Sequence, residues 1–125
     1  MRIGRRRSGT GLQHDQPCGE SACRFLEGIV AAALGIDLGE MRAAERGRAS
    51  TAFARQIAMY LAHVHLGLSL SQVGRNFGRD RTTVAHACAR VEDCRDNSQT
   101  ERILGCLETA IDRWHRGFRP AGSSR

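Results

Sequence analysis

The sequence predicts a small all-α domain that is organised around a helix-turn-helix. Apolar residues recur at three- and four-residue spacings in successive segments between Glu20 and Trp114, which is the period of amphipathic helices. Gly35, Gly67 and Gly78 follow three of these segments, at positions where a helix is expected to stop. In the middle of the chain a helix of barely two turns, a tight Gly-Arg-Asp turn and a helix with a polar leading edge follow one another, as in DNA-binding helix-turn-helix motifs.

The chain is long enough for one domain with a modest core, since it has 125 residues of which 41% are hydrophobic. Residues 1–17 combine arginines with glycine and polar residues and are expected to form a disordered basic arm. Residues 20–116 should form the helical DNA-binding domain, with the helix-turn-helix at about 70–95, and residues 117–125 a disordered tail. The arm is either a solvated tail or a flexible extension that adds phosphate contacts or enters a minor groove.

The first predicted helix begins at about Glu20 and ends at Gly35. Its apolar stripe comprises Phe25, Leu26, Ile29, Val30, Ala33 and Leu34. Asp37 is expected to cap a short helix in which Leu38 and Met41 point towards the core. The residues of these two elements offer no catalytic chemistry, so their role should be structural.

A second long helix is predicted from about Ala52 to Leu66, behind a basic loop at 44–50 and a cap at Ser50 or Thr51. Its apolar stripe comprises Phe53, Ile57, Tyr60, Leu61 and Val64. Arg55, Gln56, His63 and His65 are expected elsewhere on its surface, and Gly67 should end the helix.

The helix-turn-helix follows directly. Its first helix starts behind a cap at Ser69 or Ser71 and ends at Gly78; Asp80 caps the second helix, which extends to about Cys94. Val84, Ala87, Cys88 and Val91 fall on one side of the second helix, and Arg81, Thr82, Ala85, His86 and Ala89 on the other. The first side suits the core, and the second suits contact with base edges.

A closing helix is predicted after the polar break at 96–99. Its apolar positions are Ile103, Leu107, Ile111, Trp114 and Phe118. This stripe is expected to cover the core with Trp114 as its largest anchor. A homodimer through the same helix is the alternative, because so small a protein would otherwise leave much apolar area exposed.

The charge of the chain is concentrated on its central stretch. All 19 basic residues are arginine, and without lysine neither a P-loop lysine nor a Schiff-base lysine is available. The stretch from Arg46 to Arg90 has seven arginines and one acid, Asp80, so it carries the whole net charge of +6. The rest of the chain is balanced. This distribution is the electrostatic footprint of a phosphate-binding surface.

Several classes of protein are disfavoured by what the sequence lacks. The five cysteines have neither a C-x-x-C pair nor a spacing typical of zinc sites, so no metal and no cofactor is expected. Paired carboxylates and an activated nucleophile are not evident, so an enzyme is not expected. No apolar run is long enough for a membrane span or an export signal, and we expect a cytoplasmic, nucleoid-associated protein without a membrane or nucleotide partner.

Four blocks in fixed order carry a family resemblance: ARQIAMYL at 54–61, GLSL at 67–70, FGRD at 77–80 and TTVAHA at 82–87. They closely resemble the C-terminal DNA-binding domain of the bacterial replication initiator DnaA. The likeness is strongest over 55–90 and extends more loosely over 25–114. It implies an all-helical domain whose helix-turn-helix binds short duplex sites called DnaA boxes.

In that family an Arg-Asp-His-Thr-Thr run enters the major groove. Arg79, Asp80, Thr82 and Thr83 match this run, but Arg81 occupies the histidine position. The resemblance implies base contacts from Asp80, Arg81, Thr82 and Thr83. Asp80 can accept from a cytosine amino group, and Arg81 can fork onto O6 and N7 of guanine, so the preferred site should differ from that of the family.

The resemblance also implies an arginine of the basic loop in the minor groove. An ungapped alignment places Gly47 there, so Arg46 or Arg48 must supply the contact or it is lost. The expected phosphate contacts are Gln56, His63, Leu70, Ser71, Arg75, Arg79 and His86. His63 stands where the family can have a lysine, so its contact should be weaker at neutral pH.

The initiator's ATPase core and helicase-loading region have no counterpart in the sequence, which therefore resembles a stand-alone reader domain. The first hypothesis for its function is sequence-specific binding of double-stranded DNA, as a regulator of transcription or replication at sites similar to DnaA boxes. The alternative is a protein-interaction adaptor that keeps the fold, binds another regulator through the closing helix and has no specific DNA readout.

Overall fold

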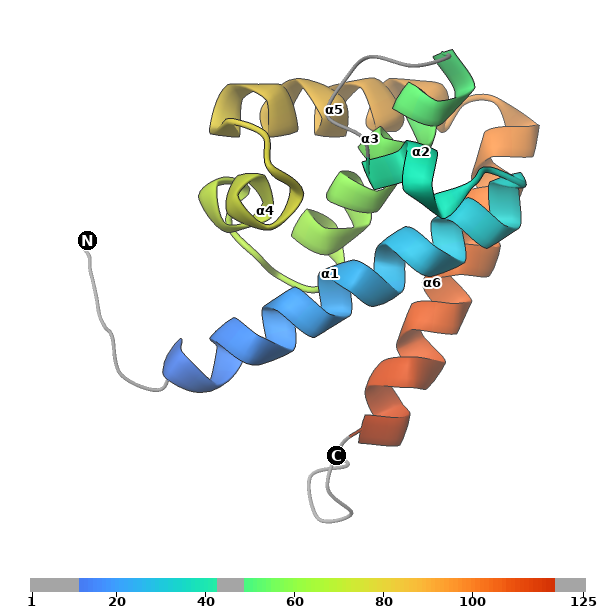
Figure 1. Ribbon diagram of the computed structural model, residues 1–125. Coiled ribbons are helices and arrows are strands. Elements are labelled where there is room, and N and C mark those ends of the chain that lie inside the picture. Colours follow the sequence, from blue (N-terminus) through green and yellow to red (C-terminus); the bar gives the residue numbers. More distant parts are fainter. Residues whose placement is uncertain (1–11, 43–48, 119–125) are drawn as a thin grey trace.

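The computed structural model describes residues 12–42 and 49–118, and within them the chain forms six α-helices and no strand (Figure 1). The helices are α1 (Leu12–Leu34), α2 (Leu38–Arg42), α3 (Ala49–Val64), α4 (Leu70–Phe77), α5 (Arg81–Cys94) and α6 (Ser98–Phe118). The all-α expectation is confirmed, and α4 and α5 lie where the helix-turn-helix was predicted.

The core is built around α3, which contacts α1, α2, α4 and α5. Tyr60 and Leu61 of α3 are fully buried, together with Leu26 of α1 and Val84 of α5. Across the front of the molecule in Figure 1, α1 runs beneath α3 and meets α6. Burial of the apolar stripes against a central helix supplies the main driving force for this arrangement.

The predicted helix ends of the helix-turn-helix are confirmed in detail. Ser69 begins α4 with a capping box, in which its hydroxyl accepts from the Gln72 N–H at 3.0 Å and the Gln72 side chain accepts from the Ser69 N–H at 2.8 Å. Gly78 ends α4 with φ at 69°, in the left-handed region that favours glycine. Asp80 caps α5.

Some predicted boundaries are wrong. The helix α1 begins at Leu12 and not at about Glu20, so residues 12–17 of the expected arm are helical. Once a helix is nucleated, each added residue gains a hydrogen bond, and a helix can thus extend beyond its apolar stripe. At the other end α6 extends to Phe118, two residues into the expected tail. Residues 1–11 and 119–125 lie outside the described part of the chain.

The start of α3 also differs from the prediction, because the helix already includes Ser50 and Thr51, which therefore do not cap it. At its far end Val64 is 48% exposed although it continues the apolar stripe. The apolar stripe continues beyond the last turn of α3 that packs against another helix. Periodicity alone does not show where this packing stops.

The closing helix uses its apolar stripe within the chain. Leu104, Leu107 and Ile111 are buried in the core, and the Trp114 ring stacks on Phe25 of α1 with centroids 4.5 Å apart. The expectation that this helix covers the core is confirmed. The homodimer gains no support, because Leu107, Ile111 and Trp114, which would contribute to its surface, pack within the chain. Among the helices described, none has the length and hydropathy to cross a membrane.

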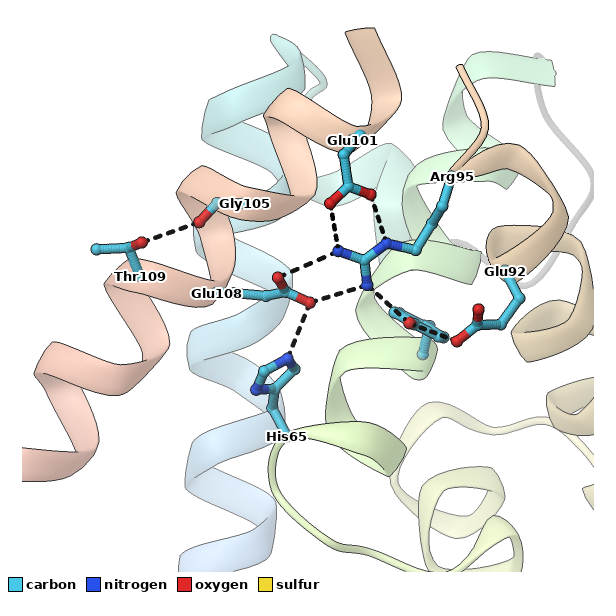
Figure 2. A network of polar contacts seen from close by, with 8 residues as sticks. His65, Glu92, Arg95, Glu101, Gly105, Glu108 and Thr109 are labelled. Carbon is cyan, nitrogen blue, oxygen red and sulfur yellow. Dashed lines mark hydrogen bonds and ion pairs between the residues drawn. The ribbon is translucent and has the colours of Figure 1, made fainter. Parts of the chain in front are cut away.

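A polar network joins the C-terminal end of α5 to α3 and α6 (Figure 2). The Arg95 guanidinium donates to Glu101 over 2.7 and 3.0 Å and to Glu108 over 3.0 and 3.2 Å. It also donates to the Tyr60 hydroxyl, which in turn donates to Glu92 over 2.8 Å. Bidentate, charge-assisted hydrogen bonds of this kind fix the relative orientation of the two side chains and also add stability. The end of α5 away from the turn is therefore held in place.

Candidate nucleic-acid interface

The two helices of the motif are held in close contact by a glycine. Gly74 of α4 is buried, and a Cβ at this position would overlap the carbonyl oxygen of Arg79 in the turn. The Arg79 N–H donates to the Gly74 carbonyl over 2.9 Å. The chain can make this close approach only because Gly74 has no side chain.

The first turn of α5 carries the polar leading edge. The Asp80 carboxylate accepts from the Thr83 N–H over 3.0 Å, as an N-cap does. This backbone hydrogen bond, followed by one from the Thr83 hydroxyl, lowers the pKa of Asp80 below its ordinary value, so the side chain is an anion at neutral pH. Arg81, Thr82 and Thr83 are all exposed. The structure thus brings together the four residues predicted to contact bases.

Arg79 and His86 border this edge. Arg79 is half-buried in the turn, and one of its terminal nitrogens donates to the Gly78 carbonyl over 3.2 Å. His86 is exposed on α5, more than one turn after Thr82. Both sites are compatible with the predicted phosphate contacts, which flank the residues that would reach base edges.

The start of α4 offers the second group of predicted phosphate contacts. Leu70 is the first residue of the helix and Ser71, which is exposed, is the second. Backbone N–H groups at a helix start are not used by the helix and suit an anion. Arg75, one turn further along, is also exposed. The side chain of Leu70 itself packs against the core, so only its backbone can serve.

Two predicted contacts on α3 are constrained by their surroundings. The Nδ1 atom of His63 lies 2.7 Å from the Leu68 carbonyl and must carry the proton, because a carbonyl only accepts. Its Nε2 atom can therefore donate to a phosphate only when the ring is an imidazolium. The Oε1 atom of Gln56 is buried and has no hydrogen-bond partner among the described residues. A contact of Gln56 with a phosphate would have to come from its amide nitrogen, which is the donor of this side chain.

Sequence reasoning missed Arg55, the neighbour of Gln56. Its Nε donates to the Met41 carbonyl over 3.0 Å, while Nη2 is buried and finds no partner in the described part of the chain. Burial and then the charge of Arg79 lower the pKa of Arg55, although an arginine stays charged at neutral pH. Among the described residues neither guanidinium forms an ion pair with a carboxylate, and two such cations that act on one another favour an anion between them. The sequence signal for Arg55 is its position in the A-R-Q block, directly before Gln56.

Arg46 and Arg48, the predicted minor-groove residues, lie outside the described residues. In the part that the structure describes, no group of three or more His, Cys, Asp or Glu side chains could hold a metal ion. The described residues of the predicted interface come from α3, from α4 and the turn after it, and from the first half of α5.

A family model described as the bacterial dnaA protein helix-turn-helix matches residues 26–91. The matched segment runs from α1 to near the end of α5, so it includes all the described residues of the candidate interface.

Curated relatives agree with this match. The chain is similar to the chromosomal replication initiator protein DnaA of Picosynechococcus sp., with 33% identity over 92 residues, which are 72% of this chain and 20% of that protein. It is also 50% identical over 62 residues to the protein of that name from Gluconobacter oxydans, covering 49% of this chain and 13% of the relative. The match to the Mesorhizobium japonicum protein is 51% over 47 residues, with 37% and 10% covered. The chain thus spans a fifth or less of the length of these relatives.

Proposed function

Since the chain belongs to the family of the bacterial DnaA protein helix-turn-helix, which implies DNA binding, we propose that it binds double-stranded DNA sequence-specifically. It would act at sites similar to DnaA boxes, as a regulator of replication or transcription. The observation that carries the proposal is the exposed first turn of α5, where Asp80, Arg81, Thr82 and Thr83 face away from the core. A helix placed by its partner in this way can enter a major groove with its N-terminal residues on base edges.

Each of these side chains would contact the bases in the way that its chemistry allows. Asp80 accepts from Thr83 in the cap, and an ionised carboxylate has further lone pairs that can accept from a cytosine amino group. Arg81 has the planar fork that matches O6 and N7 of guanine. Thr82 and Thr83 can hydrogen-bond to a base or contact a thymine methyl group. Arg81 in place of the family's histidine would shift the preferred sequence towards guanine at one position.

Affinity would come mainly from the sugar-phosphate backbone. The donors are the N-terminal N–H groups of α4 at Leu70 and Ser71, the side chains of Arg75, Arg79 and His86, and Gln56 with His63 on α3. Arg55 joins this group because its Nη2 atom has no hydrogen-bond partner among the described residues. Arg46 or Arg48 would add a contact in the minor groove, where narrow segments attract arginine.

The test is a selection of bound duplexes from a random pool at near-physiological salt, followed by affinity measurements on the selected site. If about five phosphates are neutralised, a plot of log K against log salt should have a slope near −4 to −5. A selected pool without a common sequence, or binding that does not respond to salt, would contradict the proposal. No observation favours the adaptor alternative, because α6 uses its apolar stripe within the chain.

A further inference from the structure

A second positively charged site lies beside the helix-turn-helix, in a pocket between α1, α2, α3 and α4. Its volume is about 180 Å³, and its walls include Arg24, Glu27, Arg42, Arg55, Asn76 and Phe77. Three guanidinium groups and one carboxylate give these walls a net charge of +2. Arg24, Glu27 and Arg42 have no part in the interface described above.

Glu27 orients the arginines. Its carboxylate is buried, with 6% of the residue exposed, and it lies 3.0 Å from Nε of Arg24 and 2.9 Å from Nε of Arg42. A buried carboxylate requires such partners, since an unpaired buried charge is costly. Arg42 donates to this carboxylate through Nε, whereas Arg24 donates to it through Nη2 over 3.4 Å, so Glu27 sets the position of both guanidinium groups.

Direct contacts connect the pocket to the helix-turn-helix. The Nη2 atom of Arg24 donates to the Asn76 carbonyl at the end of α4 over 2.7 Å. The same guanidinium lies over the Phe77 ring, 5.6 Å from its centroid. Arg55 also lines the pocket, and the charge of Arg79 in the turn contributes to lowering the pKa of Arg55. The pocket therefore lies next to the end of the motif from which α5 begins.

Several donors around the pocket are not used. Nη2 of Arg55 is buried and has no hydrogen-bond partner within the described residues. For Arg42 the only contact found in the same part of the chain is that of Nε with Glu27, which leaves two terminal nitrogens to donate. Buried donors are normally satisfied, and an orphan in a native structure often marks a missing anion or water. Forked guanidinium groups match the oxygens of a phosphate.

We propose that this pocket holds a backbone phosphate of the bound duplex, outside the base pairs that α5 reads. The inference rests on the proposed function, which supplies the duplex. In this role Arg24, Arg42 and Arg55 extend the interface along the DNA backbone and add affinity without sequence preference. Glu27 is a positioning residue that holds two of the three arginines.

The experiment compares wild type, Arg42→Gln, Arg42→Lys and Arg113→Gln on one selected duplex at 50 and 200 mM salt. Arg42→Gln should make the log-log salt slope less steep by about 0.9, so its affinity deficit should shrink about 3.5-fold between these salt concentrations. Arg42→Lys keeps a charge and should restore most of the slope. Arg113, exposed on α6, is the matched control and should leave the slope unchanged.

Ethylation interference identifies the phosphate on the same duplex. Wild type should be blocked at one phosphate outside the selected base pairs, and Arg42→Gln should lose that position alone. Equal slopes for Arg42→Gln and Arg113→Gln, with an unchanged interference pattern, would overturn the inference. If wild type itself shows neither a selected sequence nor a salt slope, then the proposed function fails and not only its extension.

A free anion in the pocket is tested separately, with inorganic phosphate added to the DNA-free protein and the arginine Nε–H signals followed by NMR. The inference would be overturned if phosphate bound tightly and saturably, if Arg42→Gln abolished this binding, and if the same variant left the salt dependence of DNA binding unchanged. The pocket would then be assigned to a soluble phosphate. Weak binding without saturation, combined with the loss of slope in Arg42→Gln, supports the duplex phosphate. Circular dichroism of each variant establishes that the helical fold is kept.

Discussion

The carbonyl oxygen of Arg79 occupies the space that a Cβ atom on Gly74 would need, and the N–H of Arg79 donates back to the Gly74 carbonyl. Two backbone segments are thereby locked together at the turn of the motif. Any movement of this contact changes the start of α5, since Asp80 follows Arg79 directly. The stability of the turn and the placement of the reading residues are thus controlled by the same glycine.

We expect Gly74→Ala to lower both stability and DNA affinity. A methyl group forced against backbone typically costs about 1–3 kcal/mol of unfolding free energy. The higher helix propensity of alanine offsets at most about 1 kcal/mol of this. Chemical denaturation measures the stability change, and titration of the selected duplex measures the affinity.

Gly105→Ala in α6 is the matched control for that substitution. Gly105 also lies inside a helix, but a Cβ there meets no atom within 4 Å. This variant should be as stable as wild type or up to about 1 kcal/mol more stable, with unchanged DNA binding. If the two alanine variants behaved alike, the contact at Gly74 would not restrict the turn.

Asp80→Asn and Asp80→Ala separate the two roles of Asp80. Asparagine keeps the cap but loses the charge that the folded state favours, so Asp80→Asn should unfold slightly below the wild-type temperature, whereas Asp80→Ala, which also loses the cap, should unfold at a clearly lower one. Both should bind the selected duplex on the order of tenfold more weakly, because neither leaves a carboxylate oxygen to accept from cytosine. Wild-type affinity of Asp80→Asn would mean that Asp80 is only a cap. Thermal melting and duplex titration provide the two readouts.

Much of the fold was readable from local patterns. The cap at Asp80 and the stop at Gly78 are decided by the chemistry of single residues, and the structure confirms both; of the two serines that could cap α4, the structure shows Ser69. The α5 side chains expected in the core, such as Val84 and Val91, are buried as the 3.6-residue period requires. The predicted starts of α1 and α3 are wrong, because a helix can extend into residues that are not part of an apolar stripe.

The candidate interface was only partly readable. Exposure of Arg81 and Thr82 follows from the helical wheel, but the contact of His63 with the Leu68 carbonyl depends on the path of a loop. The pairing of Arg42 with Glu27 joins residues 15 positions apart, on different helices. Tertiary packing decides such contacts, and no local pattern in the sequence encodes them.

The network around Arg95 predicts an acid-sensitive stability. Burial raises the pKa of Glu108, but hydrogen bonds from Arg95 and His65 outweigh it, and the net effect is a pKa below the ordinary value of 4.5. A carboxylate with a lowered native pKa stabilises the fold above the unfolded value, and this stabilisation is lost as the pH falls through the native value. We therefore expect it to be complete at pH 7 and to decline below about pH 4.5.

Glu108→Gln tests this expectation by melting curves at pH 7, 5 and 3. The variant should melt below wild type at pH 7, because Arg95 loses a charged partner, and the difference should narrow towards pH 3 as wild-type Glu108 is protonated. Asp112→Asn, an exposed change on the same helix, should follow wild type at each pH. A difference that stayed constant from pH 7 to 3 would show that the charge of Glu108 does not matter.

Arg81 should determine which base is preferred at one position of the site. Arg81→Ala should lose about 1–3 kcal/mol of specific binding, and Arg81→Lys should recover charge but little discrimination, because an ammonium lacks the fork that matches guanine. Arg81→His, which restores the residue of the resembling family, should select a different base at that position and leave the others unchanged. Parallel selections with wild type, Arg81→His and the exposed α6 control Arg102→His measure this directly. Identical selected sites for all three proteins would show that Arg81 contacts only the backbone, since a phosphate contact weakens all sequences alike.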